Sequence, residues 1–96
     1  MSDETEQQHE ERALISAVVT FSLGKKEPYH HGYARSTTVG AVLDDARKHF
    51  DAKDEPNVVW YLSAHDERQP NDKTLEQLVG HEDEIKFRLV KEVTQG

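Results

Sequence analysis

The chain has 96 residues, 34% of them hydrophobic, and this length allows one small domain. It has no cysteine, which excludes disulfides and thiolate chemistry. It also has no apolar run long enough to span a membrane and no signal-peptide pattern, so we expect a cytoplasmic protein. The net charge of −7 argues against nucleic acid or an anionic membrane as a partner, because both would repel it.

Residues 1–12 predict a disordered acidic leader. They hold five acids, one base and no apolar residue beyond Met1, so this segment carries −4 of the total charge, five negative minus one positive. Such a segment buries too little apolar surface to offset the entropy of ordering it. We interpret it as a solubilising leader.

The first folded segment predicts a β-hairpin. Residues 15–23 alternate strictly, with the apolar side chains on odd positions: Ile15, Ala17, Val19, Phe21 and Leu23. Period-two alternation is typical of a half-buried strand. Residues 24–26 form a turn, and a second strand is expected over 27–35, with Tyr29, His31 and Tyr33 on one face.

An amphipathic helix of about three turns is expected next. Three hydroxyl residues, 36–38, precede it and are suited to capping its first N–H groups. Apolar residues then recur at spacings of three and four, at Val39, Val42, Leu43, Ala46 and Phe50. The segment 53–57 has no period, and Pro56 prevents continuation of the helix.

The remaining elements complete a sheet. A third strand over 58–62 should point Trp60 and Leu62 inward, a short strand is expected at 67–69, and one helical turn over 74–78 should bury Leu75 and Leu78. The last strand, 84–90, alternates with Ile85, Phe87 and Leu89 inward and Lys86, Arg88 and Val90 outward. The order predicts an α+β fold, a mixed four- to five-stranded sheet with one helix packed across it.

At this point the chain resembles the ubiquitin-like β-grasp family. The matching features are the opening hairpin, the helix start at Thr38-Val39 and the inward pair Trp60 and Leu62. The sequence Asp72-Lys73-Thr74-Leu75, which precedes a final strand with a tail, also matches. The resemblance covers residues 13–96, and more narrowly it is to small bacterial ubiquitin-like modifiers. It divides the chain into a leader (1–12), a β-grasp domain (13–90) and an exposed tail (91–96).

The resemblance implies a protein modifier activated at the carboxylate of Gly96, with Val93, Thr94 and Gln95 as the tail. Glycine has no side chain, so backbone and carboxylate approach a reaction centre closely. The implied partners are activating enzymes, conjugating enzymes and target proteins; we expect a monomer and no cofactor. Conjugated and sulfur-carrier relatives generally end in two glycines, whereas this chain has one. The alternatives are a non-covalent interaction module or accessory subunit and, third, a sulfur carrier.

The outward sheet face is the second candidate site. If the third and last strands are neighbours, Val59, Tyr61, Arg88 and Val90 come together on the solvent side. Tyrosine and arginine are favoured at protein interfaces, and in ubiquitin-like proteins this face commonly binds partners. The alternative is that these are ordinary exposed strand residues chosen for β-propensity.

Neither a metal site nor a catalytic site is predicted. His30 and His31 are adjacent on a strand, so they point to opposite faces and do not chelate one ion. His31 is expected to be a partly buried residue between Tyr29 and Tyr33. Acid pairs such as Asp44-Asp45 lie side by side on one element and do not face each other across a substrate, so we expect no enzyme.

Overall fold

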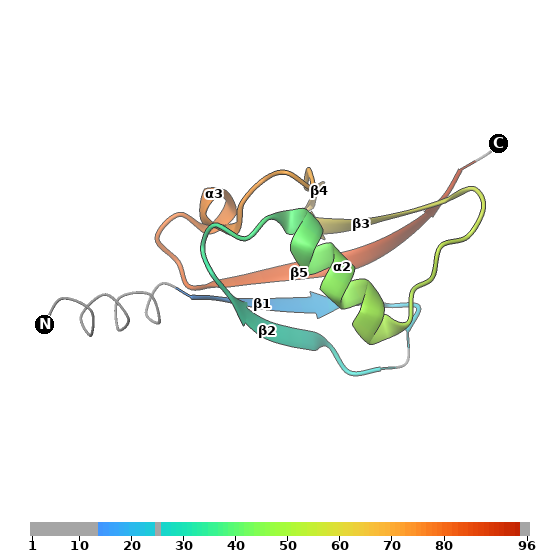
Figure 1. Cartoon of the computed structure of the whole chain (residues 1–96), viewed down its shortest axis with the longest axis horizontal. Coiled ribbons are helices and arrows are strands. Elements are labelled where there is room, and N and C mark those ends of the chain that lie inside the picture. Colours follow the sequence, from blue (N-terminus) through green and yellow to red (C-terminus); the bar gives the residue numbers. More distant parts are fainter. Residues whose placement is uncertain (1–13, 25, 95–96) are drawn as a thin grey trace, which may run out of the picture.

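A computed structural model describes residues 14–24 and 26–94 of the chain. In this part, five strands and two helices follow one another as β1 (Ile15–Thr20), β2 (Tyr29–Tyr33), α2 (Val39–Phe50), β3 (Val58–Ala64), β4 (Glu67–Arg68), α3 (Leu75–Val79) and β5 (Glu84–Val93). The strands form one sheet in the order β2-β1-β5-β3-β4 (Figure 1). Only the β1–β5 pair is parallel, so the predicted mixed sheet is confirmed.

The β1–β2 hairpin forms as predicted, but both strands are shorter than expected. β1 ends at Thr20 because a turn follows, in which the N–H of Gly24 donates to the carbonyl of Phe21 at 3.1 Å. A side chain at position 24 would meet the Phe21 ring, so this close approach requires glycine. Leu23 is therefore 69% exposed, and its expected inward position was wrong.

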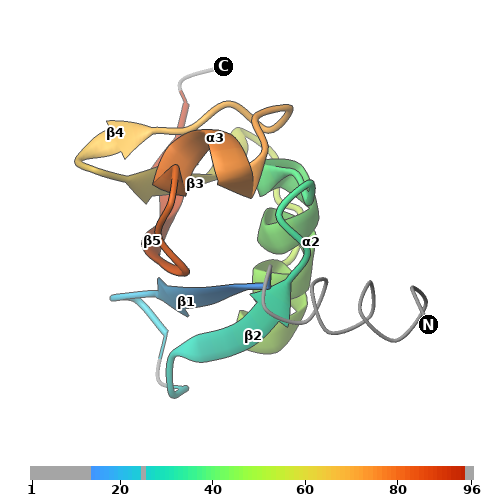
Figure 2. The ribbon, with the colours of Figure 1, turned by 90° about the vertical axis from the view of Figure 1, so that its left-hand side faces the viewer.

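Helix α2 has the predicted bounds and covers one face of the sheet (Figure 2). Thr38 is its N-cap, with extended backbone and a side chain that accepts from the N–H of Ala41 at 3.3 Å. The helix ends at Asp51, a left-handed residue whose N–H donates to carbonyls of the last turn. All five apolar residues predicted for its inner face are buried.

The core lies between α2 and the inner face of the sheet. Strands β1, β3 and β5 contribute the alternate residues that periodicity predicted: Ile15, Ala17, Val19, Leu62, Ile85, Phe87 and Leu89. Phe21 and Trp60 pack at the edge of this core, partly buried. In the described residues, the sheet face opposite α2 carries no helix (Figure 2).

Two strands in the second half of the chain are longer than predicted. β3 continues two residues beyond its expected end, to Ala64, and β5 continues from Val90 to Val93. Between them, α3 starts at the N-cap Thr74 and buries Leu75 completely, while Leu78 is partly buried. Residues 91–93, predicted to begin an exposed tail, pair with β3 as part of the sheet, although Glu92 and Val93 are exposed.

Strand β2 attaches to α2 through polar and aromatic side chains. The hydroxyl of Tyr33 donates to Oδ2 of Asp45 at 2.8 Å and lies 2.6 Å from the hydroxyl of Tyr29. His31 packs between the two tyrosine rings, as expected. It is nevertheless exposed on the edge strand β2, so its expected burial was wrong.

Candidate functional site

The four residues predicted to form an outward patch do share the outer face of the sheet. Tyr61 and Val90 are directly opposite each other in the β3–β5 pair, and opposite residues of an antiparallel pair point to the same side. The pairs on either side of this one, two residues along each strand, face the same way: Val59 is opposite Glu92, and Arg88 is opposite Ser63. Val59, Tyr61 and Val90 are half-buried and Arg88 is exposed.

Arg68 completes this patch, and sequence reasoning missed it. It lies on β4 opposite Ser63, and its guanidinium carbon is 4.6 Å from the centre of the Tyr61 ring. At this distance the cation and the ring face attract each other. An Nη1 atom of Arg68 is also 3.9 Å from Glu92. We name the set Val59, Tyr61, Arg68, Arg88 and Val90 the outer patch. The signal for Arg68 was the short strand expected at 67–69, which is too brief to show a period.

An open groove borders the outer patch where the β1–β2 turn meets β3 and β5. Its volume is about 460 Å³, and its lining includes Leu23 and Phe21 from the turn with Tyr61, Arg88 and Val90 from the strands. Leu23 exposes most of its side chain there. An exposed aliphatic residue beside an aromatic ring and arginines is a surface composition suited to protein recognition.

The C-terminal end of β5 is held against β3. Val93 is opposite Val58, and the N–H of Thr94 donates to the carbonyl of Asn57 at 2.7 Å. The Thr94 hydroxyl donates to the same carbonyl at 3.2 Å. Val93 is 70% exposed although it lies in the strand. Of the predicted tail, Gln95 and Gly96 lie outside the described residues, as does the predicted leader.

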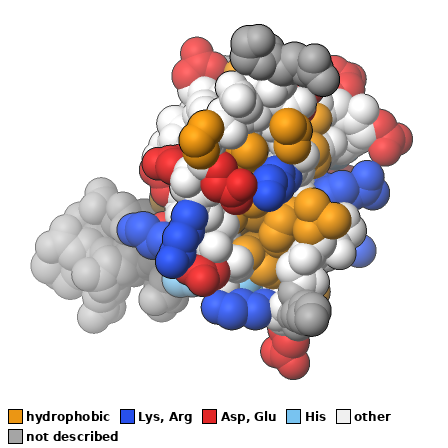
Figure 3. All heavy atoms as spheres, turned by 90° about the vertical axis from the view of Figure 1, so that its right-hand side faces the viewer, with side chains coloured by type: hydrophobic (Ala, Val, Ile, Leu, Met, Phe, Trp, Pro, Cys, Tyr) orange, Lys and Arg blue, Asp and Glu red, His pale blue; other side chains and the backbone are white. Residues whose placement is uncertain are grey.

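Hydrophobic side chains gather at the end of the molecule where β5 finishes, between basic and acidic ones (Figure 3). Leu23 and Val93, which are both exposed, lie on elements that reach this end (Figure 1). The end of β5 therefore lies next to apolar surface rather than next to a purely polar one.

Within residues 14–24 and 26–94, no group of three or more histidine, cysteine or acidic side chains is placed to hold a metal ion. His30 and His31 are on opposite faces: His30 reaches Oγ of Ser16 at 2.5 Å, while His31 lies between Tyr29 and Tyr33. None of the helices in the described part has the length and apolar character to cross a membrane.

Comparison with known proteins gives structural neighbours only. No protein-family model and no curated protein sequence matches the chain. A ubiquitin of Caldiarchaeum subterraneum superposes with a TM-score of 0.66 at 23% identity, covering 86% of this chain and 99% of that one. ATG8 of Trypanosoma brucei superposes with a TM-score of 0.67 at 13% identity, over 99% and 87% of the two chains.

A third neighbour is a protein from a structure described as molecular mimicry of SUMO that promotes DNA repair. Its TM-score is 0.60 at 18% identity, over 81% of this chain and 91% of that one. At such identities a likeness shows architecture and not activity. Together with the sheet order and the single long helix described above, this structural likeness establishes that the chain has the ubiquitin-like β-grasp fold.

Proposed function

We propose that this chain is a ubiquitin-like protein modifier, activated at the carboxylate of Gly96 and conjugated to target proteins by partner enzymes. The observation that carries the proposal is the course of β5. This strand crosses the middle of the sheet and continues beyond the core to Val93, at one end of the molecule (Figure 1). Val93, where β5 ends, is 70% exposed, so an enzyme that binds the body of the domain can reach this end of the strand.

The chemistry belongs to the partner enzymes, and this chain supplies the acyl group. In the first step a carboxylate oxygen of Gly96 attacks the α-phosphate of ATP, giving an acyl adenylate and releasing pyrophosphate. A thiol of the enzyme then displaces AMP to form a thioester. Finally a target amine displaces the thiol, and an amide bond forms. Each step is nucleophilic displacement at an activated acyl or phosphoryl centre, so the chain itself requires no catalytic residue.

The first test is activation by an ATP-dependent enzyme of the ubiquitin-activating type. We expect incubation with that enzyme and ATP to give an adenylate or an enzyme thioester, seen by intact mass spectrometry. Deletion of Gly96 should abolish the adduct, because the new terminal residue, Gln95, carries a side chain into the reaction centre. Absence of any adduct with the unaltered chain contradicts the proposal. A thiocarboxylate would instead identify a sulfur carrier.

The second candidate function is a non-covalent interaction module, and the outer patch favours it. Arg68 lies over the Tyr61 ring, Val90 is opposite that ring, and an open groove begins beside them. Rigid aromatic and arginine side chains are the residues that most often dominate binding energy at protein interfaces. This function uses the same face as the first but makes no use of Gly96.

Deletion of Gly96 separates the two functions, and substitutions in the outer patch test the face that both would use. We expect Tyr61→Ala to weaken capture of the activating enzyme, or of a non-covalent partner, by about tenfold or more, as interface anchors do. Lys48→Ala is the matched control, because Lys48 is exposed on α2, on the other side of the sheet. In a non-covalent module, deletion of Gly96 leaves binding unchanged. Equal binding by Tyr61→Ala and the unaltered chain contradicts a role for the patch in either function.

A further inference from the structure

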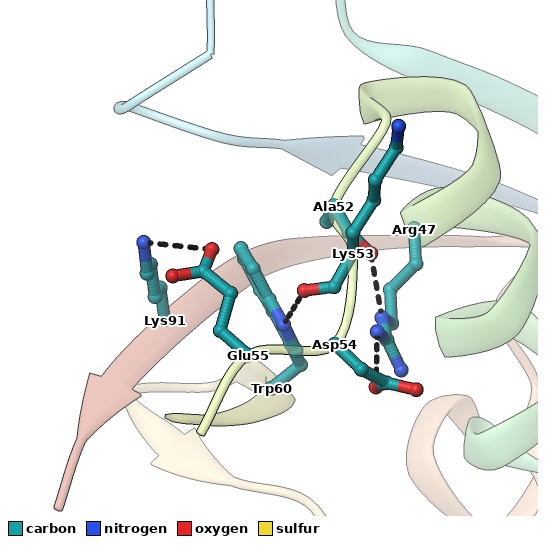
Figure 4. A network of polar contacts seen from close by, with 7 residues as sticks. All are labelled: Arg47, Ala52, Lys53, Asp54, Glu55, Trp60 and Lys91. Carbon is teal, nitrogen blue, oxygen red and sulfur yellow. Dashed lines mark hydrogen bonds and ion pairs between the residues drawn. The ribbon is translucent and has the colours of Figure 1, made fainter. Parts of the chain in front are cut away.

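The loop between α2 and β3, residues 51–57, is tied to the end of the helix. Two left-handed residues bound it, Asp51 with φ 58° and Asn57 with φ 62°. Arg47, in the last turns of α2, reaches over the loop and holds it at two points: Nε donates to the carbonyl of Ala52 at 3.1 Å, and Nη2 pairs with Oδ1 of Asp54 at 2.7 Å (Figure 4). The loop is therefore anchored along its first half.

Trp60 links this loop to the sheet. Its indole Nε1 donates to the carbonyl of Lys53 at 3.1 Å (Figure 4). The guanidinium of Arg47 and the ammonium of Lys91 lie 5.7 and 5.8 Å from the centre of its ring, within the range of cation–π attraction. The Phe21 ring packs against the indole in a T-shaped arrangement, with the two ring centres 5.6 Å apart. One side chain thus contacts a helix residue, a loop, a turn residue and the last strand.

The second half of the loop holds the end of β5. Nζ of Lys91 lies 3.3 Å from Oε2 of Glu55, as Figure 4 shows. Three residues later, Thr94 donates twice to the carbonyl of Asn57. Lys91 is on the inner row of β5, opposite Trp60, where a strand inside the core would carry an apolar residue. Its ammonium group meets both Glu55 and the Trp60 ring, so the charge is paired at the border of the core.

We propose that these contacts form a C-terminal clamp, made of Arg47, Glu55, Asn57, Trp60 and Lys91. The clamp holds residues 91–94 on β3 and so fixes the direction in which the chain beyond Thr94 leaves the body. Trp60 and Lys91 are its positioning residues. Because a held segment loses less freedom on binding, the clamp lowers the entropic cost of delivering the terminus to a partner. This last role rests on the proposed modifier function, whereas the clamp itself does not.

The clamp is tested by amide hydrogen exchange of Thr94, followed by NMR on the full chain. Loss of one hydrogen bond or ion pair to the loop should raise the exchange rate of this amide by about fivefold, in both Trp60→Phe and Lys91→Met. Lys86→Met is the matched control, because Lys86 is exposed on the outer row of the same strand. The amide of Ala17, in the buried centre of β1, reports any general loss of stability.

Rescue distinguishes the ion pair from a general effect of substitution. Lys91→Glu places two acids together and should speed exchange at Thr94, and adding Glu55→Lys should restore slow exchange by reversing the pair. An unchanged Thr94 rate in Lys91→Met and Trp60→Phe overturns the clamp. So does a change of equal size at Thr94 and Ala17, because it shows only global destabilisation.

The delivery role is tested by adenylate formation with the activating enzyme. Lys91→Met should raise KM for the chain by about fivefold and leave kcat unchanged, since a positioning effect acts on binding and not on the chemical step. A lower kcat at constant KM, or an unchanged KM, overturns the delivery role. If the unaltered chain forms no adenylate, the modifier proposal fails, while the exchange result still decides whether the clamp exists.

Discussion

At the scale of single residues, Tyr33 has the most unusual environment in the described chain. It is 9% exposed, and its hydroxyl lies between the hydroxyl of Tyr29 and the carboxylate of Asp45. Burial, followed by the hydrogen bonds to Tyr29 and Asp45, raises the pKa of the Tyr33 phenol well above its ordinary value. The hydroxyl therefore stays protonated and joins the edge strand β2 to helix α2.

We expect Tyr33→Phe to lower the free energy of unfolding by about 1–2 kcal/mol at neutral pH, because Asp45 and Tyr29 lose their shared partner. Above pH ~10, Tyr33 ionises in the unfolded chain but not in the folded one. Unfolding then releases a proton, so stability falls as the pH rises. This fall should be shallower in Tyr33→Phe. Urea unfolding at neutral pH and above pH ~10 measures both effects.

Tyr61→Phe is the control for this prediction. The Tyr61 hydroxyl makes no hydrogen bond within the described residues, so its removal should change the free energy of unfolding at neutral pH by less than about 0.5 kcal/mol. If both substitutions behave alike, the contacts of the Tyr33 hydroxyl do not stabilise the fold.

At the scale of elements, the N-termini of the two helices support each other. The N–H of Val39 donates to the carbonyl of Lys73 at 2.8 Å, and the N–H of Leu75 donates to that of Thr37 at 2.9 Å. An isolated bridge joins Thr38 to Thr74, the two N-cap residues. Free N–H groups at a helix start must find acceptors, and here each helix obtains two from the segment that leads into the other. This explains how a helix as short as α3 holds its place.

We expect Thr74→Ala to cost about 1 kcal/mol of stability, the usual effect of losing an N-cap side chain. Thr74 accepts from the N–H of Gln77 at 3.3 Å, and the Gln77 side chain accepts from the N–H of Thr74 at 2.9 Å. This reciprocal capping box is lost in the variant. Chemical denaturation measures the change. Ser36→Ala, in the exposed turn before α2, should leave the free energy of unfolding nearly unchanged. A loss of stability in Ser36→Ala as large as that in Thr74→Ala would show that the capping box contributes nothing.

At the scale of the whole molecule, the two ends of the domain meet in the centre of the sheet. β1 and β5 are parallel neighbours, in register from Ser16 with Glu84 to Thr20 with Arg88. Each is flanked on its other side by an antiparallel partner, β2 or β3. The central pairing joins residues 68 positions apart, as Ser16 and Glu84 show, so it forms only when nearly the whole domain is present. The same arrangement puts the outer patch and the end of β5 on one continuous element.

The sequence alone determined the inner rows of β1 and β5, the apolar face of α2 and the outward direction of Tyr61, Arg88 and Val90. These features follow from local periodicity, which neighbouring residues carry by themselves. Only the tertiary structure decided that Arg68 covers Tyr61, that His31 is exposed and that β5 continues to Val93. The end of β5 depends on side chains distant in sequence, since Lys91 meets Glu55 across 36 positions. No local pattern encodes such a contact, because its free energy arises only when both segments are already in place.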